Sequence, residues 1–381
     1  MIRRLGAIRR EQEEIAANGG VPKRTFAEAA AQYVARHKHI DSIDETIRQL
    51  ALIAPWINDK PLAQVHDGAL QPFIAKRQNE TVRKRVLLED GTYATKTVPV
   101  SNSTINHTLE VVRRVLNFAY TKLQDDLPNG EARKWLRTAP VVSLLPDSQA
   151  REPYPLSWQE QEYLLRELPG HLQRMSLFKV NTGTREQEVC QLRWSWEVQV
   201  PELETSVFIV PKGFVKNDED RLIVLNRVAR SVVEECRGMH REFVFAYRRN
   251  VDRLHQDGTQ RRCDRTVSAN PRPVVRINNN AWRKGRLRAA RRLAADSGLP
   301  AERVAAFAAV RVHDLKHTFG RRLRAAGVGR ETRSVLLGHA NGDITTHCSG
   351  AELAELIAAA EKVCGVNRSL PTLTVLKRRA A

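Results

Sequence analysis

The sequence lacks any feature that would place the protein in a membrane. Its 381 residues contain no run of about 18 apolar residues, the length that a membrane-spanning helix needs. The N-terminal segment, 1–20, begins basic and turns acidic, without the apolar stretch of a secretory signal. We therefore expect no membrane partner and a cytoplasmic location, in a bacterial cytosol or nucleoid.

Cysteine is scarce, with five residues in the whole chain. These cysteines are scattered, odd in number and without a CxxC pair: Cys190, Cys236, Cys263, Cys348 and Cys364. This pattern favours reduced thiols over disulfide bonds or a zinc site. The sequence therefore predicts no metal centre.

Acidic residues are outnumbered by basic ones. The 62 Lys and Arg residues exceed the 43 Asp and Glu residues and give a formal net charge of +19. Such a charge favours polyanions such as nucleic acid. Charge alone fits a ribosomal or nucleoid protein equally well, so the motifs must identify the chemistry.

The first part of the chain is typical of a helical domain, 21–137. Apolar residues recur at three- and four-residue intervals and predict helices at 26–37, 44–57, 70–77 and 103–123. Thr25 and Glu28 form a capping box at the first of these helices. A β-hairpin insertion is expected near 80–100, because Asp90-Gly91 separates two stretches rich in β-branched residues.

The remaining chain is typical of a linker followed by a second domain. Four prolines mark 138–155 as an extended interdomain linker. The second domain, 156–365, precedes a basic tail at 366–381. Its expected elements are helices at 157–168 and 171–181, an antiparallel pair of strands at 206–210 and 221–225, and further helices to residue 364. The predicted fold class is mainly α with a small antiparallel β-sheet (α+β).

Two segments of the second domain carry cations suited to binding phosphate. Arg185 lies near the start of a helix, where its planar guanidinium can form two parallel hydrogen bonds to phosphate oxygens. An exposed arginine at a helix cap is the alternative. Lys216 lies in the polar turn between the two strands, with Lys212 as its competitor. An ordinary solvated lysine is the alternative there.

Two later segments carry histidines. In VRVHDLKHTFGRRLRAAGV, His313 and Lys316 are three residues apart on one helix face and can converge on one anion. A structural histidine on a basic surface is the alternative. The next helix ends at Gly338, so His339 lies just past its end. A capping signature for the final helix then begins at residue 349, immediately after Cys348.

These motifs, in this order, resemble those of the tyrosine recombinases, the family of the phage integrases. TGTREQEVCQLRW is similar to the first arginine motif of the family, and KNDEDRLIVL to its β-hairpin lysine segment. HDLKHTFGRRLRAAG is similar to its second motif, and LLGHANGDITTHCSGAELAELI to its last histidine and nucleophile segment. The resemblance spans nearly the whole chain. It implies a helical, SAM-like core-DNA-binding domain and a catalytic domain, which together form a C-shaped clamp around double-stranded DNA.

The resemblance also implies a role for each candidate residue. It makes Arg185 a phosphate-clamping arginine and Lys216 the general acid that protonates the departing 5′-oxygen. It makes His313 and His339 hydrogen-bonding or proton-transfer groups of the phosphate site. Lys316 lies where the family usually has a second arginine, so the charge is kept and the planar fork is lost. The family joins its tyrosine to DNA through a 3′-phosphotyrosyl link, without metal, ATP or another cofactor.

Cys348 lies where the resemblance places the nucleophilic tyrosine, because TTHCS replaces a TTHYS pattern. No tyrosine follows His339. A thiol is acidic enough to attack a phosphodiester. Without the aromatic ring, however, the side chain falls short by roughly 3 to 4 Å, and a misplacement of about 1 Å can cost about a hundredfold in rate. We therefore expect a site-specific recombinase or integrase that cleaves DNA weakly or not at all.

Basic helices are expected to add DNA contacts. These residues are Arg113 and Arg114 in the first domain, and Arg283, Lys284, Arg286 and Arg288 in NNNAWRKGRLRAARRLAA. A solvated helix face is the alternative. The helix near 350–364 is expected, from the resemblance, to pack into a neighbouring protomer, giving a dimer on each site and a tetramer at synapsis. Packing within its own chain is the alternative.

Two other functions stay open. A non-catalytic, sequence-specific DNA-binding protein would explain the charge and the missing tyrosine, but it has no need for the candidate catalytic residues in register. A type IB topoisomerase-like enzyme shares the chemistry. The HDLKHT and LLGH segments and the helical N-terminal domain argue against the topoisomerase.

Overall fold

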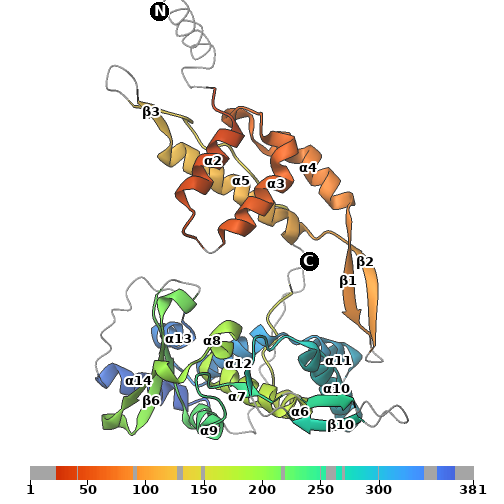
Figure 1. Ribbon diagram of the computed structural model, residues 1–381, viewed down its shortest axis with the longest axis vertical. Coiled ribbons are helices and arrows are strands. Elements are labelled where there is room, and N and C mark those ends of the chain that lie inside the picture. Colours follow the sequence, from red (N-terminus) through yellow and green to blue (C-terminus); the bar gives the residue numbers. More distant parts are fainter. Residues whose placement is uncertain are drawn as a thin grey trace, which may run out of the picture. The chain divides into compact units, whose positions relative to one another are not determined.

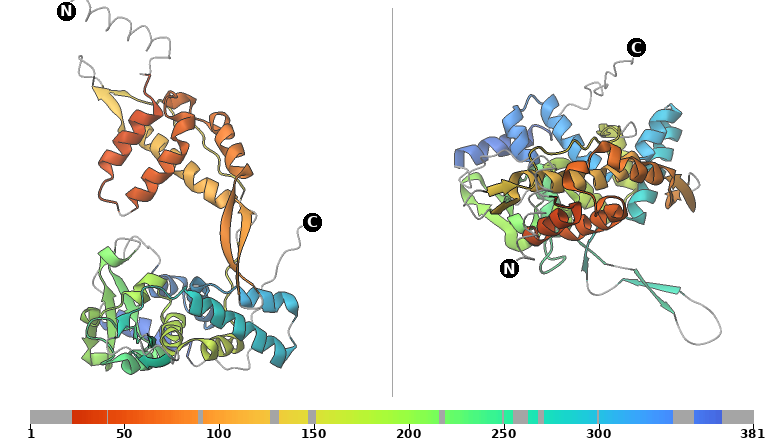
Figure 2. Two further views of the ribbon diagram at one scale, coloured as in Figure 1. Left: turned by 45° about the vertical axis from the view of Figure 1, so that its right-hand side comes forward. Right: turned by 90° about the horizontal axis from the view of Figure 1, so that it is seen from above.

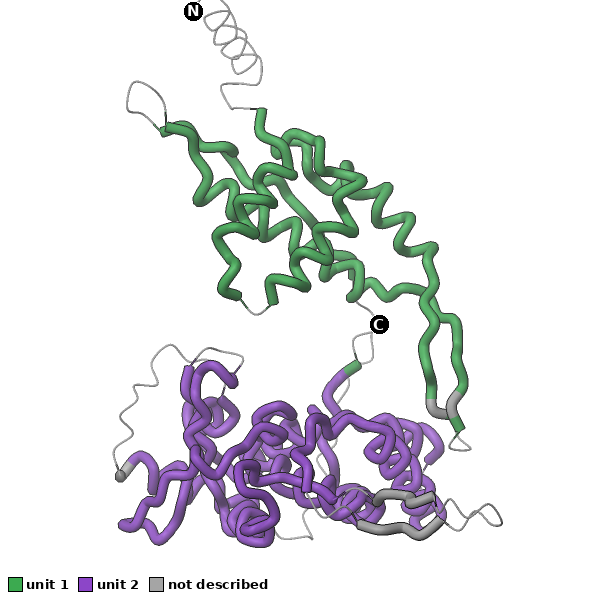
Figure 3. Tube along the Cα trace, viewed as in Figure 1, with its two compact units in different colours: residues 1–88, 92–151 green, residues 89–91, 152–381 purple. Residues whose placement is uncertain are grey.

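The computed structural model describes residues 23–40, 42–88, 92–126, 132–146, 151–215, 219–248, 250–254, 263–267, 271–298, 300–338 and 350–364. The chain divides into two compact units, with the boundary between Arg151 and Glu152 (Figure 3). Each unit has a hydrophobic core of its own. In the described part of the chain, no helix is both long enough and apolar enough to cross a membrane.

Unit 1 is a helical bundle with two antiparallel hairpins (Figure 1). Its helices are α2 (Phe26–Arg36), α3 (Ile43–Ile57), α4 (Asp67–Asn79) and α5 (Asn102–Lys122). Its hairpins are formed by β1 (Thr81–Leu87) with β2 (Tyr93–Pro99) and by β3 (Gln124–Asp126) with β4 (Ala132–Lys134). The four predicted helices and the hairpin insertion are confirmed. The β3–β4 pair was not predicted.

The apolar stripe of α5 forms the centre of the unit 1 core. Ile105, Leu109, Val112 and Leu116 are fully buried, and α5 packs against α2 and α3. Burying each such side chain contributes about 1.5 to 3 kcal/mol relative to exposure. Val142, in the segment expected to be linker, is also buried in this core. Residues 138–146 therefore have no helix or strand but still pack on unit 1.

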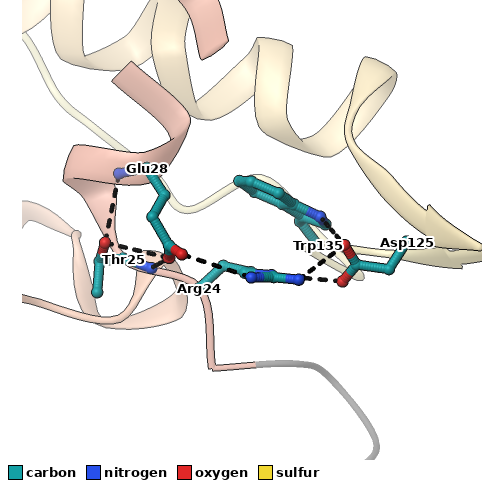
Figure 4. A network of polar contacts seen from close by, with 5 residues as sticks. All are labelled: Arg24, Thr25, Glu28, Asp125 and Trp135. Carbon is teal, nitrogen blue, oxygen red and sulfur yellow. Dashed lines mark hydrogen bonds and ion pairs between the residues drawn. The ribbon is translucent and has the colours of Figure 1, made fainter. Parts of the chain in front are cut away.

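Polar contacts join the start of α2 to the β3–β4 end of unit 1 (Figure 4). The predicted capping box is confirmed, since Thr25 Oγ1 accepts from Glu28 N at 3.3 Å and Glu28 Oε2 accepts from Thr25 N at 2.7 Å. Arg24 donates to the two carboxylate oxygens of Asp125 at 2.9 and 3.4 Å. Asp125 also accepts from Trp135 Nε1 at 3.0 Å. These bonds fix the position of α2 on the bundle.

Unit 2 is mainly helical, with small antiparallel sheets (Figures 1 and 2). Its helices are α6 (Trp158–Glu167), α7 (Gly170–Thr182), α8 (Glu186–Cys190), α9 (Arg227–Cys236), α10 (Asn280–Ser297), α11 (Ala301–Ala308), α12 (Val312–Ala325), α13 (Arg330–Leu337) and α14 (Gly350–Glu361). A three-stranded sheet has the order β5 (Glu197–Val200), β6 (Thr205–Val210) and β7 (Arg221–Val224). Two further pairs are β8 (Ala246–Tyr247) with β11 (Arg272–Pro273) and β9 (Asn250–Leu254) with β10 (Cys263–Val267). The predicted fold class and the predicted strand pair are confirmed, and β5 was not predicted.

Helix α7 lies at the centre of unit 2. Leu172, Met175 and Phe178 are completely buried, and α9 and α12 pack against α7. The helix predicted at 171–181 is confirmed as α7, and its position depends on the helices that pack around it. This packing sets α12 beside the turn that follows α7.

Helix α14 packs on its own unit. Leu356, Ala360 and Val363 form a buried cluster with Phe319 and Leu323 of α12. Asn226 Nδ2 donates to Ala360 O at 3.3 Å, and Arg227 Nη1 to Glu361 Oε1 at 2.6 Å. These contacts hold α14 within unit 2.

Candidate active site

The turn between α7 and α8 positions Arg185. Gly183 ends α7 with a left-handed backbone, φ +66°, and an added Cβ there would lie 2.6 Å from Phe319. The chain then reverses and Arg185 becomes the N-cap residue of α8, as the sequence predicts. Its guanidinium donates to Glu188 Oε1 at 2.8 Å through Nη1 and to Gly338 O at 3.0 Å through Nη2.

Lys316 and Arg221 reach the same end of α13 from two other elements. Lys316 Nζ, on α12, donates to Leu337 O at 2.5 Å. Arg221, on β7, donates through Nη1 to Val335 O at 2.7 Å and through Nη2 to Leu336 O at 2.6 Å. With Arg185, three cations therefore satisfy four successive carbonyl groups at the C-terminus of α13. A helix C-terminus carries partial negative charge and unpaired carbonyl groups, and this is the physical reason that the cations gather there.

Glu188 is the acidic member of this group and is 2% exposed. Burial alone would raise the pKa of its carboxyl group, but Arg221 and Arg185 hold that pKa below its ordinary value. The carboxylate therefore stays ionised and orients Arg185. One carboxylate against two arginines and a lysine leaves the group with excess positive charge, as a phosphate site requires.

Lys316 titrates near neutrality. The side chain is 4% exposed, and burial, followed by the neighbouring Arg185 and Arg221, lowers its pKa to about 7. At that pH, the ammonium and the neutral amine are present in similar amounts. Lys316 can therefore supply a charge to an anion or give up a proton.

Arg221 was not predicted as a site residue. It is 4% exposed, and burial lowers the pKa of its guanidinium to about 10, with Glu188 acting in the opposite direction. An added Cβ at Gly338 would lie 2.5 Å from its Nε. The glycine at the end of α13 therefore makes room for this arginine, and its φ of +58° confirms the predicted left-handed helix end. An arginine near the start of a strand gives no sequence signal for this role.

Lys179 was missed as well. It is completely buried in α7 and donates from Nζ to Thr184 O, one residue before Arg185. Burial lowers its pKa to about 8, while Glu188 and Glu186 oppose that shift. A lysine inside a buried helix is rare unless it is paired. The place of Lys179 within the predicted helix was therefore the sequence signal that could have identified it. Its bond holds the turn that presents Arg185.

His313 lies in the first turn of α12, three residues before Lys316. The residue as a whole is exposed. Partial desolvation of the ring, followed by the nearby His317, Lys179 and Lys316, nevertheless lowers its pKa to about 4. The rings of His313 and His317 contact each other edge to face, with centroids 4.7 Å apart. His313 is therefore neutral at pH 7 and can accept or donate a hydrogen bond without adding charge.

Two other residues of HDLKHT anchor the chain at its entry into unit 2. Asp314 Oδ1 accepts from Tyr154 N at 3.1 Å, and Thr318 Oγ1 accepts from Leu156 N at 2.9 Å. Both side chains are buried. The motif therefore combines two candidate site residues, His313 and Lys316, with two residues that hold the preceding segment.

The structure brings together some of the predicted residues and leaves others outside its description. Arg185 and Lys316 bind adjacent carbonyl groups, and His313 lies within electrostatic range of Lys316. Three predicted catalytic positions lie outside the described residues: Lys216, His339 and Cys348. Lys212, the competitor of Lys216, belongs to a short 3-10 turn, and its main-chain N–H donates to Asp220 at 2.9 Å.

The predicted DNA-binding residues divide into two groups. Three of them bind protein atoms: Arg113 donates to Val142 O, Arg286 to Val310 O, and Arg288 to Glu167. Arg114 and Lys284 are exposed, and Arg283 is partly exposed. The basic face of α10 is thus partly occupied, since Arg288 binds α6 and Arg286 binds the segment after α11.

Residues 159–348 match the sequence model of the phage integrase family. The chain belongs to the phage integrase family. The match covers the elements that carry Arg185, Arg221 and Lys316. A comparison with curated proteins gave no match for this integrase-family chain.

Two solved integrase structures are similar to this chain. The Tn1549 transposon integrase in complex with transposon right end DNA is 15% identical, with a TM-score of 0.50 over 87% of this chain and 98% of that chain. A lambda integrase tetramer bound to a Holliday junction is 12% identical, with a TM-score of 0.47 over 86% of this chain and 80% of that chain. At 15% identity, the likeness to the Tn1549 protein concerns the fold.

Proposed function

We propose that this chain binds double-stranded DNA as a site-specific recombinase, and that it cleaves DNA weakly or not at all because Cys348 occupies the position of the nucleophilic tyrosine. The observation that carries the proposal is the convergence of Arg185, Lys316 and Arg221 on the end of α13. In the sequence, His339 follows Gly338 directly. The family match, which ends at residue 348, supports the same assignment.

The proposed chemistry follows from the charges. A tyrosine at position 348 would attack a DNA phosphorus through its oxygen, and the bond from phosphorus to the 5′-oxygen would break. Lys216 would give the departing 5′-oxygen its proton. Arg185 and Lys316 would stabilise the negative charge on the other phosphate oxygens, since fixed cations lower the energy of a charged transition state. The 5′-hydroxyl of a partner strand would reverse the step.

The present sequence departs from this scheme twice. Lys316 offers a point charge instead of a guanidinium fork. Cys348 lacks the reach of a tyrosine by roughly 3 to 4 Å, and small misplacements are costly in rate. Both departures weaken cleavage, whereas neither removes the positive charge that binds phosphate. The proposal therefore keeps DNA binding and most of the phosphate site.

Restoration of the nucleophile tests the proposal. The preferred site would first be selected by the full-length chain from a library of random duplexes, and a nicked suicide duplex would then be made from it. We expect the Cys348→Tyr variant to form a covalent protein–DNA adduct and the unchanged chain to form little or none. The matched control is Cys348→Tyr combined with Arg185→Ala, which should lose the adduct.

Each outcome decides a separate point. No adduct with Cys348→Tyr would reject the nucleophile assignment. A thiophosphoryl adduct with the unchanged chain would reject the loss of cleavage. Equal adduct with and without Arg185 would remove that arginine from the phosphate site. Uniform relaxation of supercoiled DNA by the restored variant, without pairing of two duplexes, would favour a topoisomerase-like enzyme.

We also propose that α14 leaves its own unit when protomers assemble on DNA as a dimer or tetramer. Its contacts with β7, α12 and α13 are intramolecular in this structure. The bond between Arg227 and Glu361 lies at the surface. Its loss should make it easier for α14 to leave its own unit. Size-exclusion chromatography of the DNA complex of Arg227→Gln would show whether larger assemblies form.

A further inference from the structure

The β1–β2 hairpin of unit 1 has no role in the site described above, and its shape and charge are unusual. Its strands pair over seven residues each, from Thr81 opposite Pro99 to Leu87 opposite Tyr93. At about 3.4 Å per residue, the ribbon is about 24 Å long. In Figures 1 and 2, it extends away from the helices of its unit.

Both faces of the hairpin are open to solvent. Val82, Arg83 and Lys84 on β1 and Lys96 on β2 are all exposed, and Val82 is 47% exposed. Isolated two-stranded hairpins are marginally stable in water. A ribbon of this length that buries neither face therefore needs another reason to be present.

The charged residues of the two strands are all basic. Lys84 lies directly opposite Lys96, so two ammonium groups share one face of the pair. Arg83 and Arg85 alternate with Lys84 and therefore belong to the other face. Like charges directly opposite each other destabilise a sheet. No ion pair of Arg83, Lys84 or Lys96 with a carboxylate occurs among the residues that the structure describes.

We infer that this hairpin binds in the major groove of double-stranded DNA, with Lys84 and Lys96 against phosphates; the inference rests on the DNA binding proposed above. The major groove is about 12 Å wide and admits a two-stranded ribbon, whereas the minor groove is about 6 Å wide. A polyanion also removes the repulsion between the two lysines. The hairpin thereby adds a DNA contact outside the phosphate site of unit 2.

Exposed lysines on edge strands can also serve only to prevent aggregation. That role and the proposed one differ in their effect on DNA affinity. Neutralising phosphate-bound lysines lowers the dependence of binding on salt, by about 0.9 in the slope of log K against log salt for each contact. Lysines that only keep the ribbon soluble contribute nothing specific to that slope.

The test uses the full-length chain and a fluorescein-labelled mixed-sequence duplex of about 30 base pairs. Anisotropy titrations across several salt concentrations compare the chain with Lys84→Gln/Lys96→Gln. We expect about tenfold weaker binding at low salt and a slope reduced by about 2. The matched control is Lys38→Gln/Lys122→Gln, which removes the same charge from exposed positions of the same unit and should bind nearly as the unchanged chain does.

The groove is tested by competition. The unchanged chain should displace methyl green, a major-groove ligand, more effectively than the hairpin variant does, while displacement of netropsin from the minor groove should be equal. Unchanged affinity and slope in the hairpin variant, or an equal loss in the control, would overturn the inference and leave the proposed function intact. Failure of the unchanged chain to bind the duplex would instead overturn both.

Discussion

Nη2 of Arg185 donates a hydrogen bond to the main-chain oxygen of Gly338 at 3.0 Å. The two residues are 153 positions apart in the chain. Lys316 binds the carbonyl oxygen one residue earlier, and Arg221 binds the two before that. The end of α13 is therefore the common anchor of three elements.

A Cβ at Gly338 should destabilise the fold more than a Cβ at Gly298 does. Gly338→Ala combines a left-handed backbone, φ +58°, with a Cβ only 2.5 Å from Arg221 Nε. The matched control is Gly298→Ala, which has the same φ of +58° but open space around its Cβ. Chemical denaturation should show a loss of about 1 to 2 kcal/mol for the control and at least about 1 kcal/mol more for Gly338→Ala. Equal losses would mean that the Arg221 side chain moves away from the added Cβ without lowering the free energy of unfolding.

Arg221 is expected to act as a positioning residue. Arg221→Met removes the guanidinium donors of Val335 O and Leu336 O, although the main-chain N–H of Gly338 still donates to Val335 O. The free energy of unfolding should therefore fall by about 1 to 3 kcal/mol. In the Cys348→Tyr background, adduct formation should slow, and Arg221→Lys should restore part of it. Arg230→Met serves as the control, because Arg230 binds a single carbonyl oxygen, at 3.2 Å, on a more exposed surface. An unaffected adduct rate would contradict the positioning role.

DNA binding should depend on pH through Lys316. With a pKa of about 7, this side chain is a cation below neutrality and loses its charge above it. Affinity for duplex DNA should therefore fall between about pH 6 and about pH 8. Lys316→Arg should flatten that part of the profile, because a guanidinium stays protonated throughout. Anisotropy titrations at constant salt measure both profiles, and identical profiles would refute the role of Lys316.

The free energy of unfolding should rise with pH, whereas the affinity for DNA should fall. The folded pKa of Lys316, about 7, lies below its ordinary value of 10.5, so the unfolded chain binds more protons between these two values. The free energy of unfolding should therefore rise with pH across this window, by at most about 1.4 kcal/mol per pH unit for this group. Lys179, with a pKa of about 8, adds a contribution of the same sign. The difference between the unchanged chain and Lys316→Met isolates Lys316, and parallel curves would contradict the prediction.

The Thr318 hydroxyl should contribute to the stability of the fold and not to the charge of the candidate site. Thr318→Val keeps the shape of the side chain but removes the acceptor of Leu156 N, which lies 2.9 Å from Oγ1. A buried N–H group without a partner should cost about 1 to 3 kcal/mol in thermal or chemical unfolding. Thr121→Val is the comparison, because its hydroxyl is exposed and bonds only within α5. A cost equal to that of Thr121→Val would mean that water replaces the lost bond.

Local sequence predicted most of the helices. Periodic apolar residues identified α5, whose stripe is buried as expected, and the capping residues Thr25 and Glu28 fixed the start of α2. Gly338 marked the end of α13. These features depend on residues a few positions apart, so the sequence displays them directly. The strands β3 and β4 carry only three residues each, too few to show a period, and they were missed.

The sequence by itself determined that the chain is a basic, mainly helical protein with ordered motifs of the phage integrase family, and that Arg185, His313 and Lys316 are candidates for one site. Only the tertiary structure decided that Arg221 and Lys179 support this site, that Arg113, Arg286 and Arg288 bind protein atoms, and that α14 packs on its own unit. The physical reason is how far apart in the chain the interacting residues lie. Caps and periodic stripes join neighbours along the chain, whereas a buried cation is positioned by carbonyl groups more than a hundred residues away, and no local pattern encodes that distance.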